Sequence, residues 1–121
     1  MAVERRSCPR YPLACDAQVL LPNGGNHQAT TIHVSRNSVQ IVCSASLVTD
    51  LLKQQRLPYL CTLEFTLPWY RRKFRIEAQL ITQRRVSQQQ YSLDLLFRHQ
   101  DQQQASLLAS LLEQNVEAEA P

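Results

Sequence analysis

Most of the chain alternates between apolar and polar residues with a period of two, which is the spacing of strands that bury one face. This pattern predicts six strands, over residues 13–21, 28–34, 39–43, 59–67, 74–82 and 91–97. Turn-forming residues separate the strands. The strongest turn signal is 22–26, which contains both glycines of the chain and predicts a hairpin. Residues 35–38 and 68–72 are expected to be turns, 84–90 a polar loop, and 48–55 a short helical turn that ends before Pro58.

The period changes after residue 100. Four leucines then form an apolar stripe at helical spacing: Leu107, Leu108, Leu111 and Leu112. Asp101 is expected to be the N-cap of this helix, with Gln104 completing a capping box, and the helix is expected to end near Gln114. The stripe fits docking onto the strands, and it equally fits contact with a second copy or another protein.

Consecutive short strands followed by one helix predict an all-β fold, a small antiparallel β-barrel of about six strands with a C-terminal α-helix. A length of 121 residues fits a single domain. We expect a flexible N-terminal arm over 1–12, the barrel and helix over 13–114, and a frayed tail over 115–121.

Composition narrows the functional classes. The chain is 44% hydrophobic with a net charge of +3, which is typical of a globular protein and too weakly basic to predict general nucleic-acid binding. The four cysteines lack C-x-x-C spacing and are expected to be reduced. The N-terminus has no apolar leader segment, and no apolar run reaches membrane-spanning length, so we expect a cytoplasmic protein.

The first ten residues concentrate positive charge. Arg5, Arg6 and Arg10 lie beside Pro9 and Pro12, and the two prolines favour an extended backbone. A guanidinium group forms paired hydrogen bonds with a phosphate or with the edge of a guanine. Basic residues near a terminus are also compatible with a merely solvated segment.

A second segment, around Ser35, indicates what the N-terminal arginines could bind. Arg6 and Arg10 form an R-x-x-x-R motif before the first strand, and Ser35 follows at the end of an early strand. With the strand order and the terminal helix, these residues resemble a PilZ domain, the bacterial receptor module for cyclic di-GMP. The family carries D/N-x-S-x-x-G in the second segment. Here His33 stands in place of the Asp or Asn, and Ser38 stands in place of the Gly.

The resemblance implies a cyclic di-GMP site in which Arg6 and Arg10 are the main anchors and Ser35 assists. Neutral His33 offers one donor and one acceptor, so it replaces only part of the family's guanine recognition. The Cβ of Ser38 restricts the close approach that glycine allows. Affinity is therefore expected to be lower than with an intact motif. The expected ligand-binding residues are Arg5, Arg6, Arg10, His33, Ser35, Arg36 and Ser38.

Nothing in the sequence predicts catalysis, a cofactor or a metal site, because it contains no glycine-rich phosphate loop, no nucleophile beside a base and no zinc spacing. We expect a non-catalytic receptor that relays cyclic di-GMP to an unidentified protein effector. The alternative is a degenerate PilZ-like adaptor that contacts proteins without the ligand. A further hypothesis, single-stranded nucleic-acid binding through residues 69–72, ranks last because it rests on one aromatic pair. A homo-oligomer is compatible with either main hypothesis.

Overall fold

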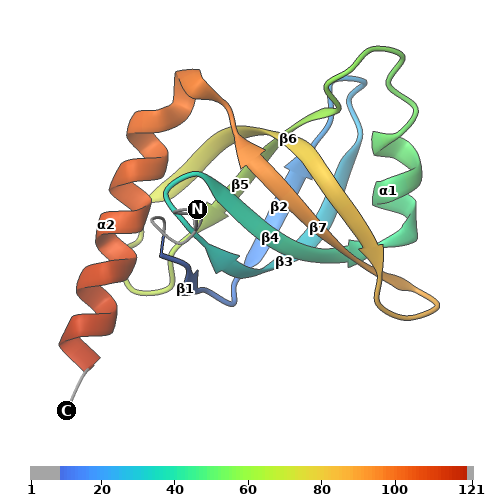
Figure 1. Ribbon diagram of the computed structural model, residues 1–121. Coiled ribbons are helices and arrows are strands. Elements are labelled where there is room, and N and C mark those ends of the chain that lie inside the picture. Colours follow the sequence, from blue (N-terminus) through green and yellow to red (C-terminus); the bar gives the residue numbers. More distant parts are fainter. Residues whose placement is uncertain (1–8, 120–121) are drawn as a thin grey trace, which may run out of the picture.

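Between residues 9 and 119, seven strands form one sheet that curls into a barrel, with a helix at each end (Figure 1). The structure, a computed structural model, describes residues 9–119. Its elements follow in chain order: β1 Tyr11–Pro12, β2 Asp16–Leu20, β3 Asn26–Val34, β4 Ser38–Ser44, α1 Ala45–Leu51, β5 Leu60–Thr66, β6 Lys73–Arg85, β7 Gln90–Phe97, a 3₁₀ turn His99–Asp101, and α2 Gln102–Glu119.

The barrel closes because β4 pairs on both of its edges. Neighbouring strands follow the order β1-β3-β2-β5-β6-β7-β4, and β4 pairs back onto β3, all in antiparallel fashion. Six strands therefore form the closed ring, and β1 is an outer strand paired with His33 and Val34 of β3. The predicted antiparallel barrel with a C-terminal helix is confirmed.

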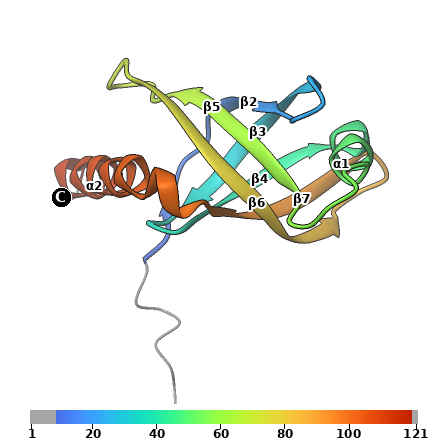
Figure 2. The same cartoon turned by 90° about the horizontal axis from the view of Figure 1, so that it is seen from above.

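The two helices cover opposite ends of the barrel (Figures 1 and 2). Helix α1 buries Leu47, Val48 and Leu51. Helix α2 buries Leu108 and Leu112, while the other two leucines of its predicted stripe pack partly buried against the same core. Of the two interpretations of that stripe, docking onto the barrel is the one that the structure supports.

Two β-bulges change which residues face outward. In a regular strand, residues on one face differ by an even number of positions. Thr31 and Val34 of β3 are nonetheless both buried, because the register shifts between Thr31 and His33. A second shift, between Leu80 and Thr82 in β6, has the same effect. The bulges therefore bring His33 and Thr82 to the outer face of the barrel.

Four local predictions need correction. Strand β6 continues to Arg85, so the predicted loop over 84–90 shortens; the bulge ends the alternation, but pairing with β7 continues through Arg84 and Arg85. Helix α1 begins at Ala45, earlier than the predicted turn over 48–55. Asp101 is not the N-cap of α2, because it belongs to the 3₁₀ turn that leads into the helix; its carboxylate accepts the backbone N–H of Glu77 at 2.7 Å. The backbone of α2 also runs to Glu119, beyond the predicted end.

The buried cysteines behave as small core residues. Cys15, Cys43 and Cys61 are free thiols, and burial raises the pKa of Cys43 to about 11 and that of Cys61 to about 12. High pKa values keep thiols protonated and unreactive at neutral pH. Cys8 lies outside the described residues. No helix within residues 9–119 combines the length and apolarity needed to cross a membrane.

Candidate functional site

A row of polar side chains crosses four neighbouring strands on the outer face of the barrel. His33 of β3 pairs with Gln40 of β4, which also pairs with Asp94 of β7. Asp94 in turn pairs with Thr82 of β6. Directly paired residues of adjacent strands lie within side-chain contact. Strand pairing thus assembles these four residues from segments that are far apart in the sequence.

Hydrogen bonds fix the orientation of the side chains in this row. His33 Nδ1 lies 3.3 Å from Gln40 Oε1, and Gln40 Nε2 donates to Ser92 Oγ at 2.9 Å. Because an amide oxygen only accepts, His33 must donate from Nδ1, which leaves Nε2 of the neutral ring as an acceptor. Thr82 Oγ1 donates to Asp94 Oδ2 at 2.7 Å. The row therefore presents acceptors at both of its ends.

A cleft of about 500 Å³ opens beside this row. Arg10 borders it because the next residues, Tyr11 and Pro12, pair with β3 and hold the end of the arm against the barrel. Arg84 borders it from the extended part of β6. The cleft thus combines two guanidinium groups with hydroxyl, amide and carboxylate groups. Its full lining is Arg10, Gln40, Thr82, Gln83, Arg84, Ser92 and Asp94.

The turn between β3 and β4 is built by Ser35. Its side chain is buried, and Oγ accepts the backbone N–H groups of Asn37 and Ser38, both at 3.1 Å. The Ser35 N–H donates to the Ser38 carbonyl at 2.8 Å. Arg36 is exposed at the tip, where its carbonyl accepts from Gln102 of α2 at 3.3 Å. Among the described residues other than glycine, only Arg71 has a positive φ, so Ser38 needs no left-handed backbone.

The structure brings together some of the predicted site residues and separates others. Arg10 lines the cleft, and His33 is one hydrogen bond away from its lining. Ser35, Arg36 and Ser38 form the adjacent turn and do not line the cleft. Arg5 and Arg6 lie outside the described residues.

Several lining residues were not predicted as part of a site, namely Gln40, Thr82, Gln83, Arg84, Ser92 and Asp94. Strand alternation does place Gln40, Ser92 and Asp94 on an outer face. It does not indicate that β4 lies beside β7, because strands paired at this seam are separated by β5 and β6 in the chain.

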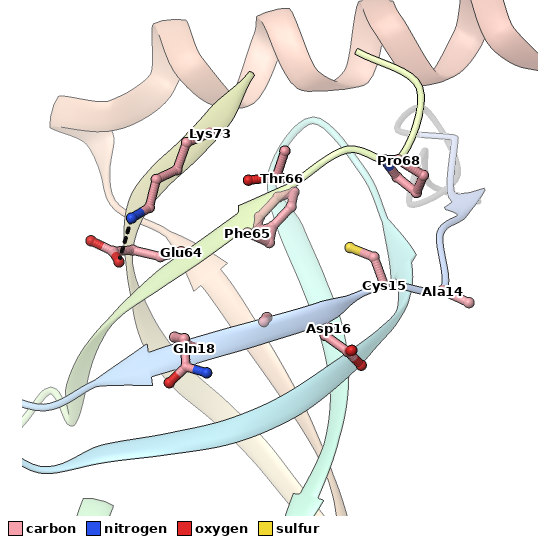
Figure 3. Close-up of a pocket in the computed structure, with 10 residues that line it drawn as sticks. Ala14, Cys15, Asp16, Gln18, Glu64, Phe65, Thr66, Pro68 and Lys73 are labelled. Carbon is pink, nitrogen blue, oxygen red and sulfur yellow. Dashed lines mark ion pairs between the residues drawn. The ribbon is translucent and has the colours of Figure 1, made fainter. Parts of the chain in front are cut away.

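A larger groove, of about 560 Å³, lies between β2 and β5 (Figure 3). In the ring order, this seam is opposite the seam between β4 and β7. Asp16 and Glu64 line it, and Glu64 forms an ion pair with Lys73 at 3.3 Å. Within the described part of the chain, no arginine lines this groove. With two carboxylates and one neutralised lysine, it is a poor site for an anionic ligand, so the smaller cleft is the candidate site.

Comparison with known proteins gives similarity in structure and none in sequence alone. No model of a protein family matches the chain, and no curated protein matches it either. Among solved structures, the PilZ domain with c-di-GMP of YcgR from Escherichia coli aligns at a TM-score of 0.64 and 12% identity, over 95% of this chain and 96% of that one. The chain has a PilZ-like fold.

Two further structures extend this PilZ-like similarity. The inhibitor of motility MotI (DgrA) from Bacillus subtilis aligns at a TM-score of 0.70 and 15% identity, over 98% of this chain and 55% of that one. MrkH from K. pneumonia, in complex with c-di-GMP, aligns at 0.67 and 21% identity, over 97% of this chain and 55% of that one. The chain thus spans nearly the whole YcgR domain but about half the length of MotI and MrkH.

Proposed function

We propose that the chain is a non-catalytic receptor for cyclic di-GMP, which binds in the cleft lined by Arg10 and Arg84. The observation that carries this proposal is the combination of two arginines with guanine-compatible acceptors on one face of a PilZ-like barrel. The structures of YcgR and MrkH with c-di-GMP support the choice of ligand.

The chemistry of the ligand matches that of the cleft. Cyclic di-GMP carries two phosphates and two guanines. Arg10, together with Arg6 from the N-terminal arm, supplies forked donors to a phosphate or to the O6/N7 edge of a guanine. His33 Nε2 is an acceptor for one guanine N–H. The turn that contains Ser35, Arg36 and Ser38 lies beside this contact and sets its geometry.

The proposed affinity is lower than that of a site with both family motifs intact. His33 supplies a single acceptor where a carboxylate would supply several, and Ser38 adds a Cβ where the family has none. Each unmatched polar group costs about 1–3 kcal/mol. Binding orders the N-terminal arm and so changes the surface that the cytoplasmic receptor presents to its protein effector.

The second candidate function is a protein-interaction adaptor that does not bind the nucleotide. The observation in its favour is the departure of His33 and Ser38 from the family motif. The two candidates differ in one measurable property, which is affinity for cyclic di-GMP.

The test is isothermal titration of cyclic di-GMP into the parent chain and into Arg10→Ala. Loss of a hydrogen bond to a charged group costs about 1.5–3 kcal/mol, so binding to Arg10→Ala should weaken by roughly 10- to 150-fold. Arg6→Ala/Arg10→Ala should abolish the heat. The matched control is Arg56→Ala, which removes an exposed arginine between α1 and β5, outside the cleft. If the parent gives no heat at ~1 mM ligand, where even −4 kcal/mol registers, the receptor proposal fails and the adaptor is preferred.

A further inference from the structure

Among residues 9–119, Asp94 is the only carboxylate that lines the arginine-bearing cleft. Its side chain lies in the same cross-strand row as His33, two strands away, with Gln40 between them. We propose that Asp94 reads the Watson–Crick edge of a guanine and thereby selects guanine over adenine. This inference rests on the proposed receptor function and assigns base selectivity to one residue of that site.

The hydrogen bonds around Asp94 leave it ready to accept from a ligand. Thr82 Oγ1 donates to Oδ2 at 2.7 Å and so holds the carboxylate in one orientation. None of the hydrogen bonds found in the described residues reaches Oδ1. The ion pairs in these residues involve Asp50 and Glu64, so neither Arg10 nor Arg84 neutralises Asp94. A positioned carboxylate beside two arginines that form no ion pair within residues 9–119 suits a ligand that has both donor and anionic groups.

A carboxylate matches guanine because it has acceptors only, whereas guanine N1–H and N2–H₂ are adjacent donors. The family places this type of acceptor at the position of His33. Here Nδ1 of His33 faces Gln40, so the imidazole offers a ligand only its remaining nitrogen. Gln40 is itself engaged with Ser92. His33 therefore lacks the two adjacent acceptors that guanine needs, and the carboxylate of Asp94 supplies them.

Adenine has a different edge, with one donor at N6 and one acceptor at N1. The carboxylate of Asp94 would meet the N1 lone pair with another lone pair, which disfavours adenine. Replacing Asp94 with Asn provides one acceptor and one donor, the pattern complementary to adenine. The variant Asp94→Asn should therefore shift base preference as well as lower the affinity for guanine.

The experiment titrates cyclic di-GMP and cyclic di-AMP into the parent chain, Asp94→Asn and Asp16→Asn. We expect Asp94→Asn to weaken cyclic di-GMP binding about 5- to 150-fold, the usual range for one bidentate base contact, and to strengthen cyclic di-AMP binding. Asp16→Asn makes the same change in charge in the opposite groove, and it should leave the ratio of the two affinities unchanged. Thermal melting of each variant checks that it is folded.

The remaining outcomes contradict the inference in distinguishable ways. If the parent binds cyclic di-GMP and Asp94→Asn leaves both affinities unchanged, Asp94 does not contact the base, so the inference fails while the receptor function stands. If Asp94→Asn weakens both nucleotides equally, Asp94 only supports the cleft, and the inference again fails. If the parent binds neither nucleotide, the inference and the receptor function fail together.

Discussion

At the scale of single residues, the structure gives Ser35 a role in the turn between β3 and β4. Its buried hydroxyl accepts two backbone N–H groups, and its Oγ lies 3.1 Å from Ser38 Oγ. A serine that closes a turn in this way fixes the positions of the neighbouring residues. His33 precedes this turn by two residues, so the turn fixes where the imidazole lies.

Replacing Ser35 with alanine should therefore reduce stability. The change leaves two backbone donors in a buried turn without their partner, at a cost of about 1–3 kcal/mol in the free energy of unfolding. Ser38→Ala removes only the contact between the two hydroxyl groups and should cost less than about 1 kcal/mol. Urea denaturation measures both values. An unchanged midpoint for Ser35→Ala, combined with lost cyclic di-GMP binding, would show that the hydroxyl contacts the ligand and does not support the turn.

The sequence could locate these residues but not assign their roles. Ser35 stands at the expected position of the family motif, at the end of an early strand, and the structure places it there. Whether its hydroxyl faces a ligand or its own backbone depends on turn geometry, which the residue types do not determine. The N-terminal part of the site, with Arg5 and Arg6, stays a prediction.

At the scale of elements, the carboxylate of Asp50 in α1 forms hydrogen bonds that hold the hairpin between β2 and β3 against the helix. Asp50 accepts from Asn23 Nδ2 at 2.9 Å, and its Oδ2 lies 2.9 Å from His27 Nε2. Hydrogen bonds from His27 and then Asn23 hold the pKa of Asp50 below its usual value of 3.8. The ionised carboxylate therefore stabilises the fold above that pH, and this contribution is lost as the pH falls through its lowered pKa.

Gly25 should not tolerate a side chain, because the hydrogen-bonded side chains of Asp50 and Asn23 lie against it. A Cβ at this position would overlap Asp50 Oδ2 and press on Asn23 Oδ1. We expect Gly25→Ala to lower the free energy of unfolding by about 1–3 kcal/mol, the usual cost of overpacking. In an Asp50→Ala background, most of the overlap is gone, so the same change should cost at least ~0.5 kcal/mol less. Equal costs in the two backgrounds, measured by urea denaturation, would contradict this contact.

The strands were largely predictable, whereas the bulges were not. Alternation located β3, β4, β5 and β7 within a few residues of their observed bounds. The register shift in β6 interrupts the alternation, so the sequence did not predict that β6 stays paired with β7 as far as Arg85. A bulge arises from the backbone pairing of two strands, so one strand's sequence does not reveal it. The outer-face positions of His33 and Thr82 therefore appear only in the structure.

At the scale of the whole molecule, the cleft is a product of barrel closure. Gln40 and Ser92 are 52 residues apart in sequence, yet their side chains are hydrogen bonded at 2.9 Å because β4 closes the ring between β3 and β7. The all-β class and the terminal helix followed from periodicity. The strand order did not, because alternation specifies a face and not a neighbour. Apart from Arg10, the lining of the cleft was therefore beyond prediction from sequence.

The most direct test of the account is a titration of the ¹⁵N-labelled chain with cyclic di-GMP, followed in amide correlation spectra. We predict that chemical-shift changes gather at Gln40, Arg84 and Asp94 and extend to the Ser35 turn. The amides of Gln18 and Glu64, in the opposite groove, should not move. Changes centred on that groove, or unchanged spectra at ligand concentrations near ~1 mM, would contradict the proposal that this cleft is a cyclic di-GMP site.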